Sequence, residues 1–272
     1  GVQTCALPIS KKRKRQQTDM TSIWKWESGN LQIKKSFLDG LQITETAKEV
    51  ISVVGAGGKT TTIRRLTDEM EKRQKNVAVT TTTRMKKEPQ FLLGADAERI
   101  AQRWGQTHQV WFGEQDDHPE KVRGVSEALL DEVRKYGPDL FLIEADGARR
   151  LPCKVPESWE PVIYQKSTRV LAVYGLDAVG KTFREACFRP GLAAEILEKK
   201  ITDPISALDI ARLALESRGG KKNVKETMRY QVILNKADTR RRRQFAQEIC
   251  RELEKRGFAD VTVTAEGRQE EK

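Results

Sequence analysis

The sequence predicts an α/β fold with a mostly parallel central sheet, formed by one domain over residues 20–272. Two observations support this prediction. Short apolar runs rich in β-branched residues alternate with segments whose apolar residues recur at helical spacing, as expected of buried strands joined by amphipathic helices. Polar motifs also follow three of the apolar runs where each run ends. Ligands of doubly wound sheets bind at that edge, so the motifs are expected to form one site.

The expected elements follow one another regularly. An amphipathic segment at 31–47 leads into the first strand, Val50–Val54. Further strands are predicted at 76–83, 109–113, 139–147, 169–177, 230–238 and 260–265. Helices are predicted after the first strand, before Gly137-Pro138, at 191–199, at 204–216 and before Gly257. Apart from the strand at 109–113, the stretch 83–122 has the least regular pattern, and we expect loops and an insertion there.

Residues 1–19 are left out of the domain. They include a basic run from Lys11 to Arg15 but show neither periodicity nor a helix cap, and we expect a non-native leader that ends before Met20. The whole chain carries a net charge of +11. Neither this run nor the one at 240–243 is interleaved with aromatic residues, so nucleic acid is not the expected partner.

Composition argues against several classes of protein. No apolar run approaches the roughly 18 residues of a membrane span. The four cysteines are scattered without a C-x-x-C pair, and two histidines are too few for a His-built metal site. We therefore expect a cytoplasmic protein with reduced thiols and no membrane partner.

The first polar motif is the glycine-rich loop Gly55-Ala56-Gly57-Gly58-Lys59-Thr60-Thr61. Glycines let backbone N–H groups approach an anion, and a helix N-terminus adds a favourable dipole. Lys59 would bridge the β- and γ-phosphates, and the Thr60 hydroxyl would bind Mg²⁺. Only two residues separate Gly55 from Gly58, where the usual phosphate loop has four. We predict a nucleotide site in a P-loop NTPase-like three-layer fold, with a short loop.

The second motif, Glu144-Ala145-Asp146-Gly147, ends an apolar strand. An acid in this position beside a phosphate loop typically orients the water shell of Mg²⁺. We expect Glu144 on the metal and Asp146 near the reacting phosphate. The E-x-x-G element resembles that of metal-delivery GTPases in hydrogenase and urease maturation.

The third motif is Asn235-Lys236-Ala237-Asp238, which resembles the N-K-x-D guanine-recognition motif of GTPases. A carboxylate at Asp238 would accept from guanine N1–H and N2–H, each bond contributing roughly 1.5–3 kcal/mol. Adenine offers an acceptor at N1 and would leave that carboxylate unpaired. The motif favours GTP, with ATP as the alternative.

A second loop, GLDAVGKT at 175–182, matches the full phosphate-loop spacing. Its context is poorer, because Pro190-Gly191 soon follows and no apolar stripe begins there. We expect it to contribute substrate contacts rather than the main phosphate site. The weaker candidates for contacts with substrate or the γ-phosphate are Thr82, Thr83, Arg149, Arg150, Lys154, Asp177 and Lys181.

Taken together, the strings GAGGKTTT, TTTTRM, EADGARRLPCKVP, GLDAVGK, Arg189-Pro190 and LNKAD resemble the YqeC family over about residues 31–264. Members are described as accessory proteins of selenium-dependent molybdenum hydroxylases. The resemblance implies a bacterial cytosolic protein that helps to install a labile selenium ligand at a molybdenum cofactor, with a hydroxylase as client. The short loop is also similar to the G-T-N-G-K-[ST]-T loop of Mur ligases, in which a two-residue gap binds a triphosphate.

Three activities fit these motifs. The leading hypothesis is a Mg²⁺-dependent, GTPase-like nucleoside triphosphatase with Lys59, Glu144 and Asp146 as catalytic residues. A kinase or ligase acting on a small substrate is the second, and a nucleotide-gated binding module without hydrolysis is the third.

Overall fold

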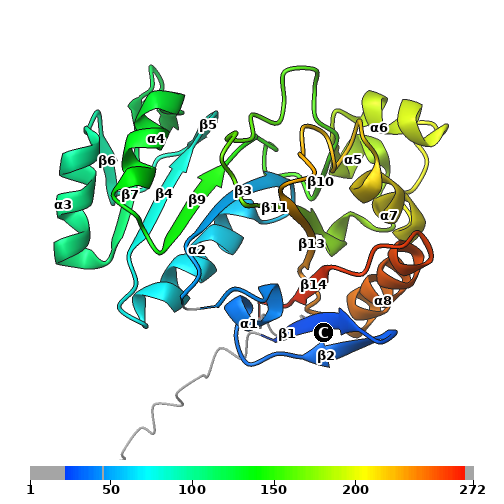
Figure 1. The fold of residues 1–272 in the computed structure, drawn as a ribbon. Helices are drawn as coiled ribbons and strands as arrows, with labels where there is room; N and C mark the ends of the chain where they lie inside the picture. The colour runs from blue at the N-terminus through cyan, green and yellow to red at the C-terminus, as the bar shows by residue number, and fades with distance from the viewer. Residues whose placement is uncertain (1–21, 45, 267–272) are drawn as a thin grey trace, which may run out of the picture.

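The computed structural model describes residues 22–44 and 46–266, which form an α/β fold around one large sheet (Figure 1). Within these residues, eight strands form its parallel centre. In order across the sheet they are β14 Val261–Thr264, β13 Arg229–Asn235, β11 Arg169–Gly175, β3 Glu49–Gly55, β9 Leu140–Glu144, β4 Val77–Thr81 and β7 Gln109–Gln115, with β6 Phe91–Leu93 beside β7. The predicted mostly parallel sheet is confirmed; the expected leader at 1–19 lies outside the described residues.

Antiparallel strands extend both edges of this sheet. The hairpin of β1, Ile23–Glu27, and β2, Asn30–Ile33, pairs with β14 at one edge. At the other edge β8, Lys121–Arg123, pairs with β7 and then with β5, Arg84–Lys86. A separate two-stranded parallel sheet is formed by β10, Cys153–Lys154, and β12, Cys187–Phe188.

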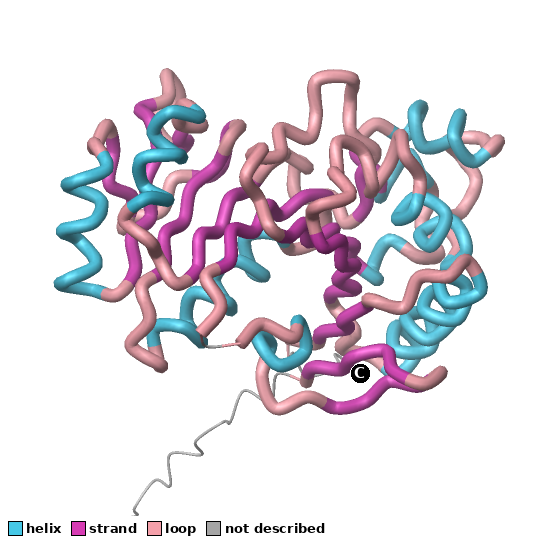
Figure 2. Tube along the Cα trace, viewed as in Figure 1, coloured by secondary structure: helices cyan, strands magenta, loops and turns pink. Residues whose placement is uncertain are grey.

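Helices cover both faces of the sheet, which gives three layers, and Figure 2 shows the strands grouped between them. One face packs against α1 Phe37–Leu41 and α2 Lys59–Glu71. The other packs against α3 Ala97–Thr107 and α4 Glu127–Lys135 at one end, and against α5 Phe183–Ala186, α6 Pro190–Leu197, α7 Ala207–Leu215 and α8 Arg240–Lys255 at the other. None of the helices in the described ranges is long and apolar enough to cross a membrane.

Alternation along β3 explains why hydrophobic cores form on both faces of the sheet. Ile51 and Val53 point toward the α2 face, whereas Val50 and Val54 belong to the cores on the opposite face. A strand buried on both faces needs apolar residues at every position, which is why Val50–Val54 is a continuous apolar run.

The order of the strands in the sheet determines where a ligand site is expected. From β3 the chain continues to β4 and β7 on one side, returns through β9 beside β3, and then crosses to β11. The switch point therefore lies where β3 ends, between Glu144 of β9 and Gly175 of β11. In α/β sheets this crevice is the usual ligand site.

Two local expectations differ from the structure. The stretch 83–122 was expected to be mostly irregular, and this is wrong, because it contains α3, β5, β6 and β8 around β7. In α3 the burial depends on few residues, chiefly Ile100 and Trp104, so the apolar pattern is sparse. The N-terminal hairpin β1–β2 was not predicted; its second strand is largely exposed, and Ile33 faces solvent.

Candidate functional site

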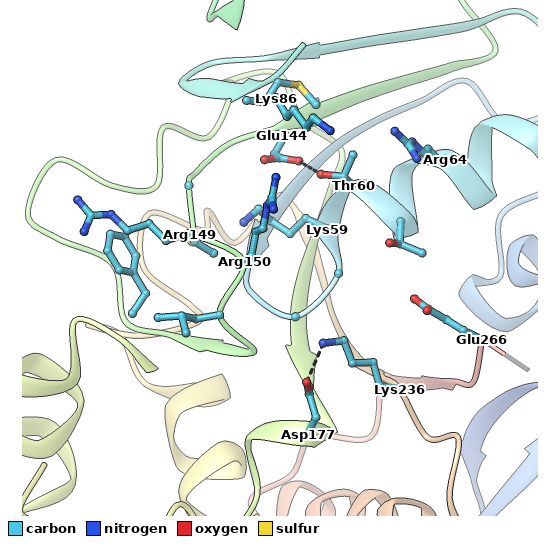
Figure 3. Close-up of a pocket in the computed structure, with 18 of the residues that line it drawn as sticks. Lys59, Thr60, Arg64, Lys86, Glu144, Arg149, Arg150, Asp177, Lys236 and Glu266 are labelled. Carbon is cyan, nitrogen blue, oxygen red and sulfur yellow. Dashed lines mark hydrogen bonds and ion pairs between the residues drawn. The ribbon is translucent and has the colours of Figure 1, made fainter. Parts of the chain in front are cut away.

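The carboxyl ends of the central strands border a cleft of about 1560 Å³ (Figure 3). Residues 57–61 of the glycine loop, Glu144, and Lys236 with Asp238 all line it, so the three sequence motifs meet in one place. Twelve lining residues are Lys or Arg and seven are Asp or Glu. This positive balance suits an anionic ligand.

The glycine loop connects β3 to α2 in a conformation that needs glycine. Gly55, Gly57 and Gly58 have φ of 91°, 81° and 130°, a region that L side chains rarely adopt. A Cβ on Gly57 would lie 2.2 Å from the backbone nitrogen of Gly175. The loop is therefore packed directly onto the end of β11.

Backbone N–H groups of the loop divide into two sets. Those of Ala56 and Gly57 donate to Val173 O at 2.8 Å and Leu151 O at 3.1 Å, which fixes the base of the loop. Within the described residues, the N–H groups of 58–61 have no acceptor, and α2 begins here at Lys59. Unpaired N–H groups at a helix N-terminus form an anion-binding site.

Lys59 is held at the floor of the loop. Its Nζ donates to Gly55 O at 2.6 Å and lies 3.0 Å from Asp146 Oδ1, and the residue is only 5% exposed. Burial alone would lower the pKa of Lys59, but the carboxylates of Asp146 and Glu144 outweigh it and the pKa is raised. Lys59 therefore stays cationic, and its ammonium can exchange Asp146 for a phosphate oxygen.

Thr60 and Glu144 lie together at the predicted metal position. The Thr60 hydroxyl donates to Glu144 Oε2 at 2.9 Å. Burial raises the pKa of Glu144, which Lys59 and Thr60 only partly offset. Among the described residues, no group of three or more His, Cys, Asp or Glu could hold a metal by itself. A hydroxyl and a carboxylate fit Mg²⁺ that takes its remaining ligands from phosphates and water.

The side-chain amide of Asn235 holds the glycine loop in place. Its Nδ2 donates to Gly57 O and Gly58 O, both at 3.4 Å, and to Thr62 Oγ1 at 3.3 Å. Thr264 donates to its Oδ1. The side chain is 2% exposed and does not line the cleft. Asn235 is thus placed to position the glycine loop, and its predicted contact with a nucleotide stays a prediction.

Asp238 and Lys236 lie on the cleft wall. Asp238 Oδ1 accepts from the backbone N–H of Glu266 at 2.7 Å, and Arg242 Nη1 is 3.6 Å from Oδ2. Lys236 Nζ donates to Asp177 Oδ2 at 2.8 Å (Figure 3). Asp177 thus joins the site from the second glycine motif and pairs with Lys236 beside it.

The basic residues that follow Glu144 have different roles. Arg149 and Arg150 are exposed, line the cleft and adopt φ of 47° and 62°. Non-glycine residues in this region are strained and cluster at ligand sites. Lys154, by contrast, has a fully buried side chain that pairs with Asp146 and Glu160 at 3.0 and 2.7 Å. It fixes Asp146 and does not line the cleft.

The second glycine motif does not form a phosphate loop. Thr182 caps the four-residue helix α5 through a capping box with Glu185. The N–H groups of Gly180 and Lys181 donate to Ile205 O and Ala178 O. Lys181, Thr82 and Thr83 do not line the cleft, and the Thr82 hydroxyl donates to Val162 O at 2.7 Å.

Sequence reasoning missed several cleft residues. Arg189 is one of them, and its guanidinium stacks 4.4 Å from the centre of the Phe188 ring. The basic run at the start of α8 is visible in the sequence. No local pattern marks the cleft residues on β5 and β8, because each of these strands is only three residues long. The unpredicted basic and acidic lining residues are Arg64, Arg84, Lys86, Glu88, Glu120, Lys121, Glu160, Arg189, Arg240, Arg241, Arg242 and Glu266.

Comparisons with known proteins agree with the motifs. A family model described as YqeC protein matches residues 51–191, which include the glycine loop and Glu144. The chain is 30% identical over 200 residues to "Uncharacterized protein YqeC" of Escherichia coli (strain K12), covering 69% of this chain and 75% of that relative. No solved structure matches significantly. On both the family model and this relative, the chain belongs to the YqeC family.

Proposed function

We propose that this protein binds and hydrolyses a nucleoside triphosphate with Mg²⁺, prefers GTP, and serves the maturation of selenium-dependent molybdenum hydroxylases. The observation that carries the proposal is the meeting of Lys59, Thr60 and Glu144 around unpaired N–H groups at the start of α2. Phosphoryl transfer depends mainly on positioning and on stabilisation of charge, which these groups supply.

Each residue has a role in this proposal. The N–H groups of 58–61 and Lys59 hold the β- and γ-phosphates, while Thr60 and Glu144 hold Mg²⁺. Asp238 receives the guanine edge, and Asn235 keeps the loop in place. Arg149 and Arg150, which also line the cleft, would contact the γ-phosphate.

The test is calorimetric titration with GTP and with ATP, each with and without Mg²⁺. The wild type is expected to bind GTP more tightly than ATP, and Asp238→Asn should remove most of that preference, on the order of 10-fold or more. Lys59→Ala should abolish binding of either nucleotide. Unchanged binding by Lys59→Ala would contradict the site, whereas equal binding of both nucleotides by wild type would contradict only the base assignment.

The selenium-related role draws on membership of the YqeC family. Its test is the selenium content of a molybdenum hydroxylase matured with the wild type, with Lys59→Ala, or without the protein. Selenium loading should require the wild type. Equal loading in all three samples would oppose this role and leave nucleotide binding untouched.

One observation favours a second candidate, a kinase or ligase. The cleft continues past the phosphate loop to a basic wall from another part of the sheet. Appearance of a phosphorylated product in place of free phosphate would support transfer, whereas GTP that stays intact with Mg²⁺ and client would indicate a binding module.

A further inference from the structure

The short antiparallel ribbon of β5 and β8 has an unusual charge pattern. Arg84 lies opposite Arg123, and Lys86 lies opposite Lys121, with Met85 opposite Val122 between them. The four basic residues are exposed, while Met85 and Val122 are buried. Side chains alternate along a strand, so the four cations share one face of what we call the cationic ribbon.

Like charges directly opposite each other destabilise a strand pair. Arg84 is compensated by Asp116 at 2.8 Å, and Arg123 lies opposite Glu114 of β7. The ammonium groups of Lys86 and Lys121 have no hydrogen-bond or ion-pair partner among the residues described. The carboxylate of Asp116 attracts Lys121 and Arg123 as well as Arg84, so one acid is shared among three of the four cations. The protein therefore offsets only part of the positive charge of the ribbon, and a bound anion would offset the rest.

The cationic ribbon belongs to the wall of the cleft. Arg84, Lys86 and Lys121 line it together with the phosphate loop. β5 follows β4, whose last residue Thr81 is paired with Glu144 of β9. In Figure 3 Lys86 lies beyond Glu144 as seen from Lys59. The ribbon thus faces the position of the γ-phosphate from the metal side.

The cleft has room for more than a nucleotide. Its volume of about 1560 Å³ exceeds the roughly 300–1,000 Å³ of common small-molecule pockets. A nucleotide whose phosphates lie at 57–60 and whose base reaches Asp238 extends over β11 and β13, away from β4. The part of the cleft beside β4 and β5 would remain open.

We propose that the cationic ribbon binds the phosphate group of a second substrate, a phosphate-bearing small molecule, in the cleft beside the nucleotide. This inference depends on the proposed function, because it assumes that the nucleotide occupies the glycine loop. Two facing lysines match a compact dianion. A small molecule fits better than a nucleic acid, because the ribbon shares an inward cleft with the loop.

The test uses inorganic pyrophosphate as the probe. The full chain is saturated with a non-hydrolysable GTP analogue and excess Mg²⁺, so that the phosphate loop is filled, and pyrophosphate is titrated by calorimetry. One equivalent is expected to bind. Lys86→Glu/Lys121→Glu should weaken that binding at least about tenfold, and Lys86→Gln/Lys121→Gln should weaken it less. Analogue affinity should stay unchanged in both.

Lys35→Glu/Lys225→Glu is the matched control, because both residues are exposed, lie outside the cleft and undergo the same change of charge. It should bind pyrophosphate as the wild type does. No uptake by the analogue-saturated wild type, or equal uptake by the ribbon variant, would overturn the inference. Loss of analogue affinity in the ribbon variant would also overturn it, because the ribbon would then bind the nucleotide. Failure of the analogue to bind the wild type would instead contradict the proposed function.

Discussion

At the scale of single residues, the buried charged side chains of the site form ion pairs with one another. Asp146 accepts from the N–H of Gly55 at 3.1 Å and pairs with both Lys59 and Lys154. A buried carboxylate that contacts two ammonium groups fixes the positions of both. If a bound phosphate drew Lys59 away, Lys154 would still pair with Asp146. The second lysine thus makes the exchange of partners by Lys59 less costly.

Glu144 provides a prediction about pH. Because burial raises its pKa above the usual 4.5, its contribution to stability is complete below that value and is lost as pH rises through the folded-state pKa. We expect Glu144→Gln to be more stable than the wild type at pH 8, by on the order of 1 kcal/mol, with a smaller difference at pH 4.5. Urea unfolding of both proteins at the two pH values measures this. A difference that is equal at both values would contradict the prediction.

Arg150 provides a prediction about turnover. It is exposed, lines the cleft and has no side-chain partner within the described residues. An arginine that neutralises charge on a transferring phosphoryl group commonly contributes about 10³-fold or more to kcat. Arg150→Ala should therefore lower phosphate release at least about 100-fold with little change in GTP affinity. Arg184→Ala, exposed and outside the cleft, should keep wild-type turnover.

Equal turnover of Arg150→Ala and the wild type would remove Arg150 from the transition state. A fall in GTP affinity with an unchanged kcat would instead mean that Arg150 binds the ground state as strongly as the transition state.

At the scale of elements, continuous apolar runs could be predicted, but short strands could not. β3 and β11 are buried on both faces, so nearly every residue is apolar and the pattern is visible. β5 and β8 are three residues long and expose their charged residues, so their pairing across 35 or more positions leaves no local signal. For the same reason, the cationic ribbon could not be predicted from the sequence.

The residues of the candidate site also divide into those that the sequence could predict and those that it could not. The glycine loop and Glu144 could be predicted because their chemistry is local in the sequence. The positions of Asn235 and Lys154 depend on contacts with distant segments, so their supporting roles could not be inferred from motif spacing. N-K-x-D predicts a nucleotide contact at Asn235, and the spacing gives no sign that its amide also holds the glycine loop.

The glycine loop itself provides a prediction at this scale. Gly57→Ala would place a Cβ 2.2 Å from Gly175 N and 2.8 Å from Pro152 O, at a φ of 81°. The loop must then separate from β11, and we expect destabilisation of roughly 2 kcal/mol or more together with loss of nucleotide binding. Gly191→Ala, with open space around the added carbon, should resemble the wild type. Thermal unfolding and GTP titration measure both effects, and normal nucleotide binding by Gly57→Ala would contradict this account.

At the scale of the whole molecule, the nucleotide would connect two parts of the sheet. Glu144 belongs to β9 on one side of β3, and Asp238 follows β13 on the other. A ligand held by both would therefore bind the folded protein and not the unfolded chain. By mass action, such a ligand stabilises the fold by about 2.7 kcal/mol at a hundred times its Kd.

This coupling predicts that the ligand raises Tm, and that the rise depends on residues from both sides of β3. With Mg²⁺ and GTP at that concentration, Tm of the wild type should rise by roughly 5–10 °C, since 1 kcal/mol corresponds to about 2–4 °C at this chain length. Lys59→Ala should show no shift, because the phosphates lose their cation. Asp238→Asn should show a reduced shift with GTP and an unchanged shift with ATP, because only guanine donates to that carboxylate. Lys225→Ala, on the surface outside the cleft, should shift as the wild type does. A wild-type shift that survives in Lys59→Ala would place the nucleotide elsewhere than on the glycine loop.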